Sequence, residues 1–355
     1  MPVDEPGSSP PRRAAHHGTQ PSDGPVRAAV VGTGLIGGSV LLGLGHAGLD
    51  VAGWDPDPAT REQLRTQGVV CPDRLDEAVV DRDVVFLCGP LPTLADTLLR
   101  VARVAGDRCV LTDVGSTKAE LADFAERHAL GHRFVAGHPM AGTDRAGLTS
   151  AVPGLFADAA WVLCPTGPGL PAFRWLAGLL RDVFRSRVVP MTAGQHDSVV
   201  ALCSHVPHLV AGALAGAAHR AELGDAVLAL AAGSFRDGTR VAGSPPGRTA
   251  NMLLGNRERV LAELAAVRAF LDELADALTA GDAGTLTARY DEARAARTTL
   301  AGCPFTGQRR EFPVDADPVA ELSYLTGLGA AGGHLTGCRV EAALVTYDAR
   351  LPQPA

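Results

Sequence analysis

The sequence has very little lysine and no surplus of positive charge. Lys118 is the only lysine in 355 residues, and 39 acidic side chains against 32 basic ones give a net charge of −7. A chain of this balance offers phosphate backbones and anionic lipids no basic surface. We therefore expect neither a nucleic-acid partner nor a membrane partner.

Paired cysteines and targeting segments are also missing. The seven cysteines are scattered without any C-x-x-C, and several lie within apolar runs. A dispersed, odd set is typical of thiols in a reducing compartment rather than of a disulfide framework. Residues 1–25 hold six prolines but no apolar signal-peptide core, and no apolar run of membrane-spanning length lacks a charge or a proline. We expect a cytoplasmic protein with a disordered tail at 1–25.

What the chain does have is a glycine-rich turn after a short apolar strand. Gly32, Gly34 and Gly37 have the spacing G-x-G-x-x-G. The first permits a tight turn, the second leaves room for a pyrophosphate, and the third lets the next helix pack closely. Asp55 follows at the end of the next strand, where its carboxylate could accept ribose hydroxyls and repel a 2′-phosphate.

These features predict a dinucleotide site that prefers NAD to NADP, because phosphates bind well at a helix N-terminus. The expected cofactor-binding residues are Gly32, Thr33, Gly34, Leu35, Ile36, Gly37, Asp55, Gly89 and Pro90.

Residues 26–192 alternate short apolar segments with amphipathic ones. This alternation predicts an α/β Rossmann domain with a doubly wound parallel sheet, in which ligands bind at the carboxyl ends of the strands. The expected strands are 26–31, 51–54, 84–88, 109–113, 134–137, 160–164 and 187–191.

Residues 193–301 lack strand signals and predict an all-α domain. The expected helical segments are 193–222, 225–232, 247–280 and 282–300. The first is apolar nearly all round and the helix at 259–278 has one apolar face, so we expect a homodimer through this domain. Residues 302–355 form a C-terminal extension, expected to be loop-like with a short helix near 317–331 and a strand at 339–347.

Two strand ends of the first domain carry side chains suited to proton transfer. His138 follows one strand, and an imidazole with a pKa of about 6.5 suits removal of a proton from a hydroxyl that is being oxidised. Its alternative role is to satisfy loop backbone groups. Ser116 follows another strand and either caps the next helix, with Glu120 near capping-box spacing, or faces a substrate.

The helical domain offers further polar candidates. His196, Ser204 and His208 share one helix face at i, i+4 spacing, where they line a cleft, bind a metal or are satisfied core groups. No matching ligand cluster occurs elsewhere, so we expect no metal. Arg240, four residues after another arginine, suits carboxylate binding, and the alternative is a surface pair bridged through Asp237.

Taken in order, these motifs resemble those of the prephenate/arogenate dehydrogenase family of tyrosine biosynthesis. Beside the glycine loop they are D-x-G-S-x-K at 113–118, G-H-P-M-A-G-T at 137–143, H-D at 196–197, S-H-x-P-H at 204–208, F-R-D-x-T-R at 235–240 and N-R-E at 256–258. The resemblance implies a Rossmann domain followed by a helical dimerisation domain. The chain departs from the family in having Asp144 where many members carry Glu, and in lacking a tryptophan soon after Arg240. The extension after 302 resembles part of an ACT regulatory domain, truncated.

The resemblance also implies roles and a reaction. His138 would accept the proton of the ring 4-hydroxyl, Ser116 would hydrogen-bond the same hydroxyl, and Arg240 would bind a substrate carboxylate. The substrate pocket would be lined by Thr143, Ser204 and His208. The implied reaction is NAD-dependent oxidative decarboxylation of prephenate to 4-hydroxyphenylpyruvate, or of arogenate to tyrosine. The alternatives are a 4-amino-4-deoxyprephenate dehydrogenase of antibiotic biosynthesis and a non-catalytic dinucleotide-sensing dimer.

Overall fold

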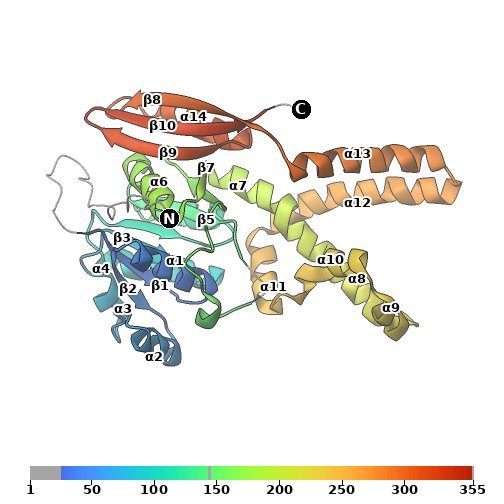
Figure 1. Cartoon of the computed structure of the whole chain (residues 1–355), viewed down its shortest axis with the longest axis horizontal. Helices are drawn as coiled ribbons and strands as arrows, with labels where there is room; N and C mark the ends of the chain where they lie inside the picture. The colour runs from blue at the N-terminus through green and yellow to red at the C-terminus, as the bar shows by residue number, and fades with distance from the viewer. Residues whose placement is uncertain (1–24, 143–144, 354–355) are drawn as a thin grey trace, which may run out of the picture. The chain divides into compact units, whose positions relative to one another are not determined.

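The chain folds as two units, described by a computed structural model over residues 25–142 and 145–353 (Figure 1). The first unit contains the described residues up to Ala193 together with 308–350, and the second contains 194–307 and the last described residues from Leu351. Thr143 and nearly all of the expected tail lie outside the described residues.

Seven short strands of the first unit occupy the places that the sequence predicts. They are β1 (Arg27–Val31), β2 (Asp50–Trp54), β3 (Val84–Leu87), β4 (Val110–Asp113), β5 (Phe134–Pro139), β6 (Ala160–Cys164) and β7 (Arg187–Pro190), in the order β2-β1-β3-β4-β5-β6-β7. The helices between them are α1 (Leu35–His46), α2 (Pro58–Thr66), α3 (Leu75–Val79), η1 (Leu91–Thr93), α4 (Leu94–Val104), α5 (Ala119–Arg127), η2 (Leu148–Ser150) and α6 (Leu170–Phe184). The predicted Rossmann architecture is confirmed.

The sheet is parallel from β2 to β5, but β6 runs antiparallel to β5. The expectation of a wholly parallel sheet is therefore wrong at this strand. Parallel strands are usually joined by a crossover helix, whereas the described part of the connection from β5 to β6 contains only the short turn η2. The longer helix α6 then allows β7 to pair parallel with β6.

Apolar strands between helices form the core of the first unit. Val85, Leu87 and Leu111 are fully buried, and they pack with Leu98 and Val101 of α4. Because both faces of these strands are covered, their sequences are continuous apolar runs rather than alternating ones.

The C-terminal extension continues this sheet with three more strands. β8 (Phe305–Pro313), α14 (Val319–Ala330), β9 (His334–Glu341) and β10 (Leu344–Pro352) extend the order to β7-β9-β10-β8. β10 lies between β8 and β9, the arrangement of a split βαβ unit (Figure 1). The expected loop-like character is wrong. β8 escaped prediction because its side chains are almost all exposed, so it has no apolar pattern.

The second unit is helical, as predicted. Its elements are α7 (Ala193–Val200), the π-helical turn η3 (Ala201–His205), α8 (Val206–Arg220), α9 (Gly224–Leu230), α10 (Gly233–Thr239), η4 (Arg240–Gly243), α11 (Pro246–Gly255), α12 (Arg257–Ala280) and α13 (Ala283–Ala301). The segment expected at 247–280 is divided at Asn256. Pro207 has no N–H to donate to the preceding turn, which accounts for the π-helical turn just before it.

Few side chains are buried in the second unit. Its core consists of Ala201, Val206 and Val260, with Leu264 and Val267 partly buried against them. The predicted apolar face of α12 continues beyond this core, and there Leu271 is 53% exposed and Leu278 is 67% exposed.

The continuous helix Ala193–Arg220 is long and apolar enough to cross a bilayer by length and composition. Only 28% of its apolar 18-residue stretch is buried. Core helices of globular proteins pass the same test. An apolar helix that its own unit leaves uncovered needs another surface to pack against.

Candidate functional site

The glycine-rich loop has the shape that its spacing predicts. Gly32 has a φ of +90°, and a Cβ there would lie 2.8 Å from the carbonyl carbon of Cys88. A Cβ on Gly37 would lie 1.9 Å from the oxygen of Gly32, so the helix packs tightly against the turn. At Gly34, by contrast, a Cβ would meet nothing within 4 Å. The loop is therefore open where a pyrophosphate would approach.

Asp55 is held in place beside this loop. Its Oδ2 accepts the Thr33 N–H at 2.7 Å, and its Oδ1 accepts the Asp57 N–H at 3.0 Å. The Thr33 hydroxyl also donates to Oδ2, at 3.3 Å. A carboxylate has about four acceptor positions, so Oδ1 keeps capacity for a ribose hydroxyl. Nη1 of Arg61 donates to the backbone oxygen of Asp55 at 2.9 Å, which places a guanidinium next to the carboxylate.

The loop after β3 converges on the same place. A Cβ on Gly32 would lie 2.9 Å from the Gly89 nitrogen, so the two loops touch. Both the N–H and the hydroxyl of Thr93 donate to the Pro90 oxygen, at 2.9 and 2.8 Å, which fixes this second loop. The predicted cofactor loops thus meet at the carboxyl ends of β1 and β3.

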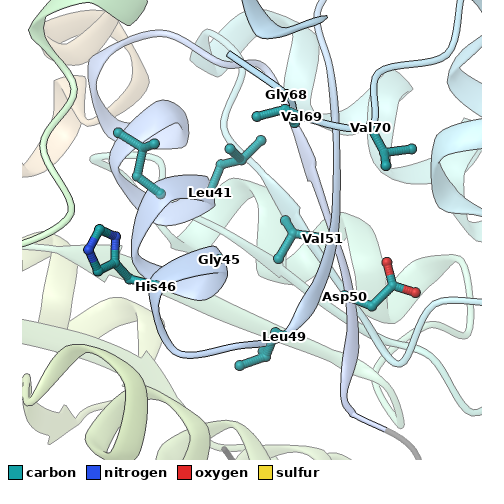
Figure 2. A pocket seen from close by; sticks show the side chains of 10 residues that line it. Leu41, Gly45, His46, Leu49, Asp50, Val51, Gly68, Val69 and Val70 are labelled. Atoms are coloured by element: carbon teal, nitrogen blue, oxygen red, sulfur yellow. The ribbon is translucent and has the colours of Figure 1, made fainter.

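A hollow in the first unit lies at the other end of the sheet (Figure 2). Its lining comes from Leu41, Leu42, Gly45, His46, Leu49, Asp50, Val51, Gly68, Val69 and Val70. Asp50 begins β2, whereas Asp55 follows its last residue. Because ligands of such sheets bind at the carboxyl ends of the strands, this hollow is not the dinucleotide site.

Ser116 lies three residues beyond the end of β4, and His138 is the penultimate residue of the neighbouring strand β5. His138 is a half-buried residue near the end of β5, opposite Val162 of β6. Ser116 is also half-buried, but it does not cap a helix, because α5 begins at Ala119 with Lys118 as its N-cap. The capping expectation is wrong, since the chain does not turn into a helix until three residues later. The alternative, that the Ser116 hydroxyl faces a substrate, stays a prediction.

A buried carboxylate connects these two positions. Asp113 accepts the Gly115 N–H on Oδ2 at 2.8 Å and the Gly137 N–H on Oδ1 at 3.1 Å. It also forms an ion pair with Lys118, and both side chains are fully buried. Sequence reasoning did not select either charged residue as part of the site. The signal that could have identified the pair is the single lysine of the chain.

The polar groups at the start of the second unit are bonded to one another, except that Nε2 of His205 is buried without a hydrogen-bond partner among the described residues. Nδ1 of His196 lies 2.7 Å from Oδ1 of Asp197, and both residues are buried. The Asn256 amide donates to the Asp197 backbone oxygen at 2.7 Å and to Nδ1 of His205 at 3.2 Å. Burial lowers the pKa of His205 to about 4. Asn256, which sequence reasoning gave no role, therefore fastens the break between α11 and α12 to this cluster.

The predicted polar face through His196, Ser204 and His208 is not continuous. The π-helical turn changes the register of the helix, so His196 is buried while Ser204 and His208 are half-buried. Nδ1 of His208 lies 2.8 Å from the Ser204 backbone oxygen.

Arg240 is exposed at the start of η4. No ion pair to Asp237 is found in the described part of the chain, which contradicts the bridged-pair alternative.

Metal-ligating residues do not gather in either unit. Within residues 25–142 and 145–353, no three His, Cys, Asp or Glu side chains lie close enough together to hold a metal ion.

Comparison with protein-family models matches both parts of the chain to one family. Residues 44–185 match the family model of the prephenate dehydrogenase nucleotide-binding domain, and residues 192–291 match that of its dimerisation domain. The chain belongs to the prephenate dehydrogenase family. The family inferred from the motifs is thus confirmed, as is the order of its two domains.

Individual members of the family are similar over most of the chain. Prephenate dehydrogenase of Bacillus subtilis (strain 168) is 34% identical over 241 residues, which cover 65% of this chain and 64% of that protein, just under two thirds of its length. A Corynebacterium glutamicum structure with a provisional prephenate dehydrogenase assignment has a TM-score of 0.76 at 28% identity, covering 86% of this chain and 97% of that one. Prephenate dehydrogenase from A. aeolicus, in complex with hydroxyphenyl propionate and NAD+, has a TM-score of 0.68 at 25% identity, covering 78% and 98%.

Proposed function

We propose that the chain catalyses NAD-dependent oxidative decarboxylation of prephenate, or of its amino analogue arogenate. The observation that carries this proposal is that Asp113 accepts hydrogen bonds from the residues just before Ser116 and His138. These bonds lie at the carboxyl ends of the strands, where the glycine loop is open. A proton acceptor and a hydroxyl beside a dinucleotide loop are the groups that oxidation of an alcohol requires. Membership of the family supplies the substrate class.

NAD fits the residues of the loop. The open side of Gly34 leaves room for the pyrophosphate, and the fixed carboxylate of Asp55 can accept ribose hydroxyls while repelling a 2′-phosphate. The A. aeolicus relative was solved with NAD+. Bound NAD would accept the hydride that leaves ring C4.

The side chains of the protein handle the proton and the carboxylates. His138 accepts the proton of the ring 4-hydroxyl as the C4–H bond breaks, and Ser116 orients that hydroxyl. The C1–carboxylate bond breaks with its electron pair entering the ring, which becomes aromatic as carbon dioxide leaves. His138 then returns its proton to the phenol oxygen of the product. Arg240 would hold a substrate carboxylate, and the pocket would be lined by Thr143, Ser204 and His208.

Such a mechanism asks little covalent chemistry of the protein. Positioning the hydride donor and polarising one hydroxyl account for most of the barrier reduction that the side chains need to supply.

We also assign the exposed apolar face of the second unit to a homodimer. Leu214 of α8 and Leu271 and Leu278 of α12 are each more than 40% exposed, in the region matched by the dimerisation-domain model. A second copy of the same face would cover these side chains. All seven cysteines are free thiols, which supports a cytoplasmic location.

The test compares the wild-type chain with His138→Asn. Each is incubated with NAD and, separately, prephenate, arogenate and 4-amino-4-deoxyprephenate, and both reduced cofactor and aromatic product are followed. We expect the wild type to turn over prephenate or arogenate and the variant to lose about 10²–10⁴-fold in kcat with unchanged NAD affinity. Turnover of the amino-deoxy substrate alone would replace the proposed substrate. NAD binding without any turnover would indicate a sensor.

A further inference from the structure

The carboxylate of Asp113 is hydrogen-bonded to two separate loops. Oδ2 accepts the Gly115 N–H at 2.8 Å and Oδ1 accepts the Gly137 N–H at 3.1 Å. Gly115 directly precedes Ser116, and Gly137 directly precedes His138. One buried side chain therefore fixes the backbone next to both groups of the proposed proton transfer.

The Asp113 carboxylate links β4 and β5 beyond the last residues that their backbones pair. β4 and β5 pair in parallel over only two residues each, and β5 then pairs with the antiparallel strand β6. Gly137 lies two residues beyond Val135, the last β5 residue paired with β4. Backbone bonds alone do not hold the two strand ends together at this point. The side chain of Asp113 supplies the missing connection.

Both glycines are required for space rather than for backbone conformation. Neither has a positive φ. A Cβ on Gly115 would lie 2.9 Å from Oδ2 of Asp113, and a Cβ on Gly137 would lie 2.9 Å from the Asp113 backbone oxygen. Any side chain at either position would push its loop away from the carboxylate.

Lys118 provides the opposite charge. It is the only lysine of the chain, while the other basic residues are all arginines, and its side chain is fully buried in an ion pair with Asp113. An ammonium is smaller than a guanidinium and bonds as a point charge. Burial of an ion pair contributes little stability on balance, because desolvation of the two charges offsets their attraction. A geometric role explains the pair better than stability does.

We propose that Asp113 and Lys118 are positioning residues that fix Ser116 and His138 relative to each other, without touching the substrate. The inference rests on the proposed function, because it assigns these two groups to the same proton transfer. It predicts that loss of the pair lowers kcat more than it changes NAD binding.

Three variants test the proposal in the full-length protein. Asp113→Asn removes the charge with little change of shape, and Lys118→Met removes the countercharge. Glu321→Gln is the matched control, because it breaks a buried ion pair with Arg174 in the same unit, away from the two loops. We expect kcat to fall at least tenfold in the first two variants, with the NAD Kd within about twofold of wild type. The control should lose stability but keep its kcat.

Two spectroscopic measurements need no turnover. Protein labelled with [¹³C]lysine and free of lysine-containing tags gives a single side-chain signal, since the chain has one lysine. That signal should move in Asp113→Asn and stay in Glu321→Gln. The ring signal of His138, assigned by its loss in His138→Asn, should move in both Asp113→Asn and Lys118→Met but not in the control.

The two readouts separate the possible failures. If the wild type oxidises none of the substrates, the proposed function fails, and the ring signal of His138 still decides whether the pair positions this residue. An unmoved His138 signal in Asp113→Asn, or a kcat that falls equally in Asp113→Asn and Glu321→Gln, overturns the positioning role. If Asp113→Asn does not fold, Lys118→Met decides by the same criteria, and if neither folds the pair is structural and the proposal is wrong.

Discussion

Asp55 shows how one side chain serves both the fold and a ligand. Its carboxylate receives backbone N–H groups from the glycine loop and from the start of α2, which fixes its orientation before any cofactor binds. The guanidinium of Arg61 lies next to it, bonded to the backbone oxygens of Asp55 and Pro56. The choice between NAD and NADP therefore depends on whether the adenosine ribose contacts the Asp55 carboxylate, which repels a 2′-phosphate, or the Arg61 guanidinium, which attracts one.

Asp55→Ser should shift cofactor preference towards NADP by at least tenfold. The substitution removes the charge that repels a 2′-phosphate and leaves Arg61 beside the space that is opened. Tenfold corresponds to about 1.4 kcal/mol, which is reasonable for loss of one close repulsion. Steady-state kinetics with both cofactors measure the shift, and Asp73→Ser, which removes an exposed carboxylate paired with Arg65, is the control. An unchanged preference would show that Asp55 does not face the ribose.

At the scale of elements, the C-terminal extension is part of the first unit rather than an appended module. Arg174 of α6 donates to Glu321 of α14 through Nε at 2.9 Å and through Nη2 at 2.5 Å. The hydroxyl of Tyr347 on β10 donates to the same carboxylate at 2.6 Å. Burial raises the pKa of Tyr347 well above its ordinary value, so the phenol remains a donor. Three elements distant in sequence are thereby joined at one buried carboxylate.

Glu321→Gln should lower the free energy of unfolding of the first unit by about 3 kcal/mol. It leaves the Arg174 guanidinium buried without a countercharge, and breaking one side of a buried pair typically costs 3–5 kcal/mol. Urea unfolding followed by circular dichroism measures the loss. Glu311→Gln, at an exposed position of β8, should leave stability within about 0.5 kcal/mol. Equal midpoints for the two variants would mean that the extension is not held by this cluster.

At the scale of the whole molecule, two buried histidines link stability to pH. Burial lowers the pKa values of His205 and His334 to about 4, and neighbouring arginines contribute at His334. The unfolded chain, with ordinary histidine pKa values of about 6.5, binds more protons than the folded chain between pH 4 and 6.5. Above this pH window the two histidines do not reduce the free energy of unfolding. As the pH falls through the window, each of them lowers the free energy of unfolding.

The free energy of unfolding should thus fall on acidification from pH 7 to pH 5, before most carboxylates titrate. A shift of this size corresponds to at most about 3 kcal/mol for each histidine at the acid end of the window. Urea unfolding at several pH values measures the slope. His334→Asn should reduce that slope, whereas a substitution of the exposed His219 should not. Equal slopes in all three proteins would contradict the assignment.

The exposed apolar face of the second unit predicts the assembly state. Light scattering at micromolar concentration should give the mass of a dimer. Leu214→Asp should shift the equilibrium strongly towards monomer, because a charge buried in an apolar interface is costly. Val70→Asp, which places a charge at an exposed position of the first unit, is the control. A monomeric wild type would leave the apolar face of the second unit without an explanation.

The sequence by itself determined what depends on neighbours along the chain. The strand-turn-helix at Gly32–Gly37, the positions of the seven strands along the chain and the helical second unit follow from local spacing and periodicity. It also placed His138 at the end of a strand, and β5 ends one residue later, at Pro139. The antiparallel direction of β6 and the strand β8 were not predictable in this way, because pairing direction and edge strands leave no apolar pattern of their own.

Only the tertiary structure decided which buried charges meet. Asp113 and Lys118 are five residues apart in one motif, but the Gly137 N–H that shares their carboxylate comes from the next strand. Arg174 and Glu321 are separated by 147 residues. The free energy of burying a charge depends on its partners in space, and a sequence read one segment at a time does not contain that information.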